Sequence, residues 1–232
     1  MQGDFKLMLF EITTRDCSVL SDGELASMAD LAAANEVNFD IGYLSKVRED
    51  WVLATDIRQD GELKGFSFYT LERIGGTPAV IIGVLVVQKC EGARDVLYAL
   101  REGQFRKALL AFPDEDVLVG SKLTDVGAFE VFEDLVDIVP KPGHKPTGEE
   151  RAWARRLARR YGSESRVDDR TFIFRGIGEV TGYSAYVPVK HSGVFRDYDE
   201  FFEPLSQDSN DTLIALGWVM AEELAKFAGL DD

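Results

Sequence analysis

Residues 88–94 join a dense apolar run, residues 79–87, to a long helical pattern, and their types suit the binding of an anion. The N–H groups in the first turn of a helix have no partner inside the helix, and the helix dipole adds positive charge at that end. Lys89 and Arg94 would add positively charged side chains. The alternative is structural, because Gly92 would suit any tight turn between a strand and a helix.

Acid–base chemistry has one candidate carboxylate near this turn. Glu72 is expected close to the end of the preceding strand, where it could take a proton from an amine directly or through water. The alternative is a solvated glutamate at a strand end. His144 and His191 are expected at the surface, Cys17 and Cys90 are expected as small core residues, and the four lack the spacing of a metal site.

Two clusters of side chains could bind further ligands. Five arginines on one short helix could hold a phosphate or form a solvated helix face balanced by acids. Six aromatic residues among acids could bind a cation, cover the sheet or form a subunit interface. The arginines are Arg151, Arg155, Arg156, Arg159 and Arg160, and the aromatic residues are Tyr183, Tyr186, Phe195, Tyr198, Phe201 and Phe202.

The composition limits the classes of partner. The chain has 232 residues with a net charge of −15, and so acidic a surface repels nucleic acid and anionic lipid. The apolar runs are too short to span a membrane, and the N-terminus does not resemble a secretory signal. With two cysteines only, a disulfide framework is not expected. We therefore expect a cytoplasmic protein that binds neither nucleic acid nor membrane.

The elements that must position these residues begin with a strand at residues 5–12. A capping box formed by Ser21 and Glu24 starts a helix that continues to residue 34, and a short helix is expected within residues 39–49. A hairpin at residues 51–74, turning at Asp60 and Gly61, leads into the apolar strand. Because that strand is apolar on both faces, it should lie at the centre of the sheet.

The rest of the chain alternates between helical and strand patterns. A helix is expected at residues 93–112, a strand at 117–123 and a short amphipathic helix at 126–135. A proline-rich linker, residues 140–147, separates this core, residues 1–139, from an extension, residues 148–232. In the extension we expect the arginine-rich helix, a strand at 171–174 and a final helix at 211–228.

This order of elements is similar to that of the GNAT family of acyl-CoA-dependent N-acyltransferases. In that family the fourth strand splays from the fifth, its end pairs with the pantetheine arm, and a glycine-containing loop holds the pyrophosphate. The resemblance implies that Val86, Val87 and Gln88 close the strand, with a backbone N–H near Val86 or Val87 polarising the acyl carbonyl. It also implies that Lys89, Gly92, Ala93 and Arg94 contribute to the loop.

The sequence departs from the family pattern at two places. Arg94 stands where the family has Gly or Ala, so the loop has one glycine where two are usual. The family's common proton donor is a Tyr on the helix after the fifth strand, but the matching segment carries Phe129 and Phe132. Phenylalanine cannot protonate a leaving thiolate, so water or another residue would have to do so.

The sequence thus predicts an α/β fold with a mixed, mainly antiparallel central sheet flanked by helices and a C-terminal extension that completes the sheet or forms a dimer interface. The resemblance implies an N-acyltransferase that moves an acetyl or other acyl group from acyl-CoA to a small, cationic amine by direct attack, with Glu72 as the base. The alternative is a GNAT-like binding, regulatory or assembly protein without catalysis. A homodimer is possible in either case.

Overall fold

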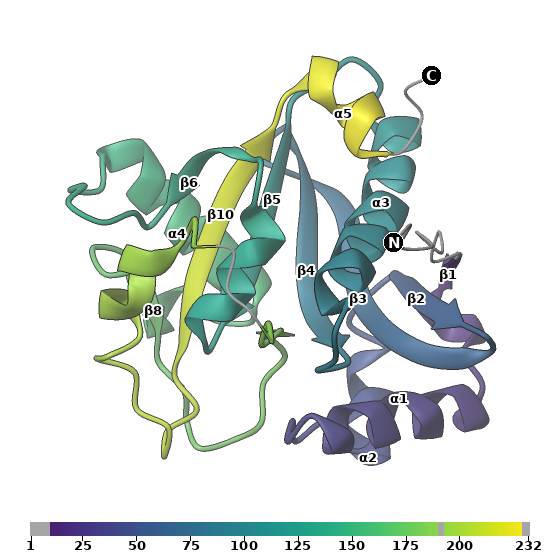
Figure 1. Cartoon of the computed structure of the whole chain (residues 1–232). Coiled ribbons are helices and arrows are strands. Elements are labelled where there is room, and N and C mark those ends of the chain that lie inside the picture. Colours follow the sequence, from purple (N-terminus) through teal and green to yellow (C-terminus); the bar gives the residue numbers. More distant parts are fainter. Residues whose placement is uncertain (1–9, 190–192, 229–232) are drawn as a thin grey trace, which may run out of the picture.

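A computed structural model of the chain describes residues 10–189 and 193–228. Within this part, ten strands form one sheet in the order β1-β2-β3-β4-β9-β5-β10-β8-β7, with β6 beside β10 (Figure 1). The strands are β1 (Glu11–Asp16), β2 (Leu53–Gln59), β3 (Glu62–Ile74), β4 (Thr77–Val87), β5 (Val117–Leu123), β6 (Val136–Val139), β7 (Val167–Asp168), β8 (Ile173–Phe174), β9 (Ser184–Ala185) and β10 (Thr212–Val219). The α-helices are α1 (Asp22–Ala34), α2 (Ile41–Val47), α3 (Ala93–Ala111), α4 (Gly148–Arg160) and α5 (Ala221–Phe227).

The first four strands form an antiparallel meander between two helical layers. On one face, Phe66 and Phe68 of β3 share a buried cluster with residues of α1 and α2. On the other face, α3 lies against the sheet, so closely that a Cβ on Gly65 would approach Val96 to 2.8 Å. Strand β4 is buried along almost its whole length, because it has sheet neighbours on both sides and helices on both faces. The predicted central strand is therefore confirmed.

Two local signals in the sequence act as expected. Ser21 accepts a hydrogen bond from the Glu24 N–H, and the Glu24 side chain accepts from the Ser21 N–H, so the capping box starts α1. Asp60 and Gly61 both adopt positive φ, at 52° and 81°, and turn the chain between β2 and β3. Both signals work through local hydrogen bonds and backbone preferences, which depend little on the rest of the fold.

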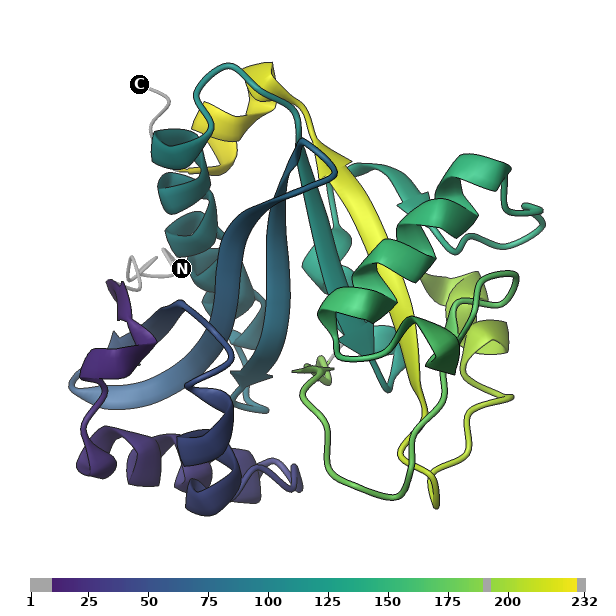
Figure 2. The same cartoon turned by 180° about the vertical axis from the view of Figure 1, so that it is seen from behind.

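The C-terminal part continues the same sheet. Strand β10 pairs antiparallel with β5 from Leu213 to Val219, and α4 covers the face of the sheet that is seen in Figure 2. The sequence prediction of a helix at residues 211–228 is wrong, because residues 212–219 form β10 and only Ala221–Phe227 is helical. Strand β10 lies between β5 on one side and β6 and β8 on the other, and after Thr212 it is apolar throughout, which suits a central strand.

Two further predictions need correction. The first strand begins at Glu11 and extends to Asp16, whereas most of the predicted strand at residues 5–12 lies outside the described residues. The segment expected as an amphipathic helix at 126–135 is a 3-10 helix, Val126–Phe132, followed by β6. Every residue from Gly127 to Phe132 is buried, so this segment packs on all sides rather than along one helical face. In the described part of the chain, no helix is long and apolar enough to cross a membrane.

Candidate functional site

Strands β4 and β5 lie side by side only at one end. They pair in parallel over three positions, Ala79 with Leu118, Val80 with Val119 and Ile81 with Gly120, and then diverge. The two strands spread toward the end that carries α1 and α2 (Figure 1). The divergence implied by the resemblance is therefore present, and it begins after Ile81, several residues before the end of β4 at Val87.

The short strand β9 occupies the space that the divergence opens. Ser184 aligns with both Leu85 of β4 and Leu123 of β5, and Ala185 aligns with Val86. The Leu85 N–H donates to the Tyr183 carbonyl at 3.2 Å, while the Gln88 N–H turns the other way and donates to the Lys64 carbonyl at 2.8 Å. In this conformation, a segment of the chain itself lies along the edge of β4 that the resemblance assigns to a pantetheine arm.

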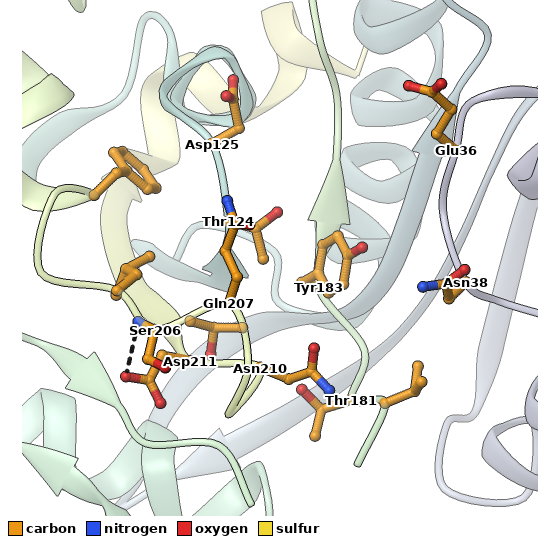
Figure 3. A pocket seen from close by; sticks show the side chains of 14 residues that line it. Glu36, Asn38, Thr124, Asp125, Thr181, Tyr183, Ser206, Gln207, Asn210 and Asp211 are labelled. Carbon is orange, nitrogen blue, oxygen red and sulfur yellow. Dashed lines mark hydrogen bonds between the residues drawn. The ribbon is translucent and has the colours of Figure 1, made fainter. Parts of the chain in front are cut away.

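A cavity of about 590 Å³ lies at the open end of the divergence (Figure 3). Glu36 and Asn38 line it from the connection between α1 and α2, Asp125 follows β5, and Asp211 immediately precedes β10. None of its lining residues in the described chain is Lys, Arg or His. Asp211 is paired with Arg175 at 2.6 Å. The other two carboxylates, Glu36 and Asp125, therefore give the cavity the negative potential that suits a cationic ligand.

Tyr183 also lines this cavity, directly before β9. Its ring packs against Phe39, with 5.0 Å between the ring centroids. Burial raises the pKa of the Tyr183 hydroxyl, so this group stays protonated at neutral pH and can donate a proton or a hydrogen bond.

A second cavity, of about 550 Å³, lies between α2 and α4. Val180 and Thr181 line both cavities, so the segment that leads into β9 separates them. The second cavity is lined by Trp51, Lys122 and Tyr161, and the predicted base, Glu72, also lines it. The Trp51 ring fits against Gly83, where a Cβ would come within 1.9 Å of its Cε2 atom.

The turn before α3 uses several of its N–H groups internally. The Lys89 N–H donates to the Asn35 side chain at 2.7 Å, the Ala93 N–H donates to the Cys90 carbonyl, and the Asp95 N–H donates to the Gly92 carbonyl. Gly92 has φ of 90° at the N-cap, a conformation that favours glycine. The positive φ therefore supports the alternative that Gly92 is needed for a tight turn. The internal hydrogen bonds also leave fewer N–H groups free to bind an anion than the motif implies.

The Arg94 side chain is bound by two other side chains of the fold. Its guanidinium donates to the Tyr98 hydroxyl at 2.9 Å and to the Glu133 carboxylate at 2.7 Å. Glu133 is buried on the segment that follows the 3-10 helix. The charge of Arg94 is thus matched within the fold, whereas Lys89 of the same turn is exposed.

Glu72 is engaged as well. Its carboxylate accepts a hydrogen bond from Arg160 Nε at 2.7 Å, and about a third of the Glu72 side chain is exposed. The Arg160 guanidinium lies 4.4 Å from the centroid of a Trp51 ring. To accept a proton from an amine, the Glu72 carboxylate would first have to give up this hydrogen bond with Arg160.

The two side-chain clusters have structural roles. Arg151 and Arg155 pair with Asp169, and Arg159 pairs with Glu164, as the balanced helix face predicts. Among the aromatic residues, Phe195, Tyr198 and Phe202 surround Phe129 with centroid distances of 4.7–5.8 Å. Phe195 and Tyr198 therefore help to cover Phe129 and the sheet, whereas Phe202 also lines the acidic cavity, as Tyr183 does.

His144, Cys17 and Cys90 line neither of the two cavities. His144 Nε2 is 2.8 Å from the Glu150 carboxylate near the start of α4, and His191 lies outside the described residues. Cys17 is buried as predicted, and burial raises its pKa to about 12, whereas Cys90 is half-buried in the turn before α3.

Sequence reasoning missed Lys122, Tyr161 and β9. Lys122 did carry a signal, because it is a charged residue in a run, Val117–Leu123, that is otherwise suited to a buried strand. Strand β9 carried none, since two residues make no pattern and its position depends on the divergence of β4 and β5.

Comparisons with known proteins found distant structural similarity. No protein-family model and no curated protein matches the sequence. The aminoglycoside 6'-N-acetyltransferase from Enterococcus faecium is 16% identical, with a TM-score of 0.39 over 50% of this chain and 64% of that one. Escherichia coli ElaA is 16% identical, with a TM-score of 0.37 over 58% and 95% of the two chains. The ribosomal-protein-S18-alanine N-acetyltransferase from Escherichia coli is 11% identical, with a TM-score of 0.37 over 60% and 86%.

The order and pairing of the strands and helices support the predicted fold. Their order, from β1 through the meander and α3 to β5, is the one that the sequence resemblance implies, and the sheet is mainly antiparallel with β4 and β5 parallel and diverging. The chain has a GNAT-like fold.

Proposed function

We propose that the protein is an N-acyltransferase that moves an acyl group from acyl-CoA to a small cationic amine. The observation that carries this proposal is the cavity of about 590 Å³ at the open end of the β4–β5 divergence, which carboxylates line and no basic side chain of the described residues does. Its potential would draw in an ammonium group and hold it beside the diverging strands.

The chemistry would be direct attack. The amine nitrogen forms a C–N bond with the thioester carbonyl carbon, the C–S bond breaks, and the thiolate leaves with a proton. The protonated Tyr183 hydroxyl lines the amine cavity and is the candidate proton donor in place of the missing Tyr after β5. Glu72 is the candidate base for an amine that reaches the second cavity, after release from Arg160.

Acyl-CoA would bind along β4 at Val86, Val87 and Gln88, with its diphosphate near Lys89, Gly92, Ala93 and Arg94. Because β9 pairs with β4 at Leu85 and Val86, this donor site requires β9 to move aside. The proposal therefore predicts weak or slow binding of acyl-CoA by the wild-type chain, and tighter binding once β9 is unpaired.

A second candidate function has its own support. The pairing of β9 with β4, together with the internal hydrogen bonds of the turn before α3, favours a non-catalytic protein that binds a small cation in the acidic cavity. In this case β9 is a permanent part of the sheet, and acyl-CoA does not bind.

Calorimetric titration with acetyl-CoA separates the two functions. The variant Ala185→Pro should unpair β9, since proline cannot donate a hydrogen bond to a sheet. Val187→Pro, two residues beyond the paired positions and half-exposed, is the matched control. We expect Ala185→Pro to bind acetyl-CoA at least tenfold more tightly than the wild type and Val187→Pro to bind as the wild type does.

Activity is then measured as release of free thiol with a panel of polyamines and amino sugars. Thiol release that depends on the amine supports the acyltransferase. Folded wild-type and Ala185→Pro proteins that both fail to bind any acyl-CoA would overturn it and leave the binding protein as the function.

A further inference from the structure

Lys122 is a buried lysine that has no acidic partner among the described residues. It lies near the end of β5, and only 4% of the residue is exposed. Among the residues that the structure describes, no side chain or carbonyl accepts a hydrogen bond from Nζ, and no carboxylate lies within ion-pair distance. This is unusual, because buried lysines are nearly always paired.

The surroundings of Nζ are aromatic and positively charged. Nζ lies 5.2 Å from the ring centroids of both Tyr161 and Phe174. The Arg166 guanidinium covers the same Phe174 ring at 4.6 Å. Burial first, and repulsion from Arg166 second, lower the pKa of Lys122 from 10.5 to about 7. Near neutral pH, a large fraction of the Lys122 side chains thus carry a neutral amine with a lone pair.

The side chain is within reach of a small molecule. Lys122 lines the second cavity, of about 550 Å³, together with Tyr161 and Trp51. The charged groups that also line it are the Glu72–Arg160 pair, Lys46 and Asp50, of which Lys46 and Asp50 are exposed. The cavity thus places a buried amine beside the aromatic rings of Trp51 and Tyr161, and burial of this kind activates lysine as a nucleophile.

We propose that this cavity binds a small aldehyde or ketone with an apolar or aromatic body, and that Lys122 captures it as an imine. The Lys122 nitrogen adds to the carbonyl carbon to form the C–N bond. The carbonyl oxygen then leaves as water with the two protons of the amine, so no oxidant or reductant is needed. Imine formation requires neither acyl-CoA nor a ligand in the acidic cavity, although Glu72, the proposed base of acyl transfer, lines the same cavity as Lys122.

Reductive trapping tests the proposal on the full-length protein. The protein is incubated at pH 7 with benzaldehyde and cyanoborohydride, and the benzylated lysines are located and quantified by peptide mass spectrometry. An ordinary lysine has a pKa of about 10.4, so the neutral fraction of Lys122 at pH 7 exceeds that of such a lysine by about a thousandfold. We expect Lys122 to be labelled at least tenfold faster than Lys46, the exposed lysine that lines the same cavity.

The variant Lys122→Met provides the control for the site. Methionine has a similar length and no charge, so it should fold without the penalty of a buried amine. We expect this variant, folded by circular dichroism, to lose the fast-labelled peptide and to keep the slow labelling of Lys46. Labelling of Lys122 no faster than that of Lys46 in the folded wild type, or an unchanged fast phase in Lys122→Met, would overturn the proposal.

Discussion

Ser121 of β5 and Ser184 of β9 share a hydrogen bond of 2.7 Å between their Oγ atoms, and both residues are fully buried. The bond lies where β4 and β5 have diverged, and Ser184 also aligns with Leu85 on the β4 side. The hydrogen bond therefore holds β9 against β5, on the side of the sheet to which the C-terminal strands belong. Any ligand that takes the place of β9 must break this bond.

The first prediction concerns the stability that this bond provides. Ser184→Ala removes one hydroxyl and leaves Ser121 with only a 3.3 Å contact to the Lys122 carbonyl. We expect the free energy of unfolding to fall by about 1–2 kcal/mol, the usual cost of leaving a buried polar group unsatisfied. Urea denaturation measures the change, and amide hydrogen exchange should become faster in residues 183–187.

Ser165→Ala is the matched control. Ser163 and Ser165 share a hydroxyl–hydroxyl hydrogen bond of 3.0 Å at the surface, where water replaces a lost partner. This variant should stay within about 0.5 kcal/mol of the wild type. If both variants lose the same free energy of unfolding, the buried hydrogen bond between β5 and β9 contributes no more to stability than the one at the surface.

Much of the first half of the fold was predictable, because its signals are local. The capping box at Ser21, the turn at Asp60 and Gly61 and the apolar run of β4 each act through neighbouring residues. The strand at residues 212–219 was not predictable, because a short and largely apolar segment is compatible with a helix or a strand. Only its pairing with β5 decides between them.

The candidate site was less predictable than the fold. Glu72 is located at the end of a strand as expected, but its pairing with Arg160 joins residues 88 positions apart. The carboxylates of the acidic cavity come from three separate connections in the chain. No spacing in the sequence encodes such a combination, which depends on the way the sheet brings these connections together.

A second prediction tests Glu72 as the base of the proposed acyl transfer. Glu72→Gln keeps the size of the side chain and removes its ability to accept a proton. We expect the turnover rate to fall by about a hundredfold or more. The stability should change by less than about 1 kcal/mol, because the ion pair with Arg160 is partly exposed to water.

Glu115→Gln is the control for a lost ion pair. Glu115 pairs with Arg73 at 2.5 Å on the surface and lines neither of the two cavities. Its variant should keep full activity. If Glu72→Gln retains the wild-type rate in the thiol-release assay, the base is a different group or water.

A third prediction follows from the burial of Lys122, which lowers its pKa to about 7. Between pH 7 and 10 the unfolded chain keeps a proton on this lysine that the folded chain has lost, so the contribution of Lys122 to stability rises with pH. Below pH 7 the folded state contains a buried ammonium and bears the full penalty. Lys122→Met, which has no such group, should therefore be more stable than the wild type at pH 6.

This stability difference should shrink as the pH rises. From pH 6 to 9 we expect it to decrease by about 2–3 kcal/mol, in urea denaturation series of the two proteins run side by side. Groups that titrate in both proteins cancel in the difference. A difference that stays constant across this range would show that Lys122 is not deprotonated in the folded protein.

A fourth prediction separates the structural role of Gly92 from its role in binding. Gly92 has φ of 90°, where a side chain is strained, so Gly92→Ala should lower the free energy of unfolding by about 1–2 kcal/mol. Gly23, in the first turn of α1, has ordinary helical φ and open space around its Cβ position. Gly23→Ala should be neutral or stabilising, because alanine is the better helix former. If both variants are as stable as the wild type, the backbone of the turn does not require glycine, and close approach of a ligand becomes the stronger reason for its presence.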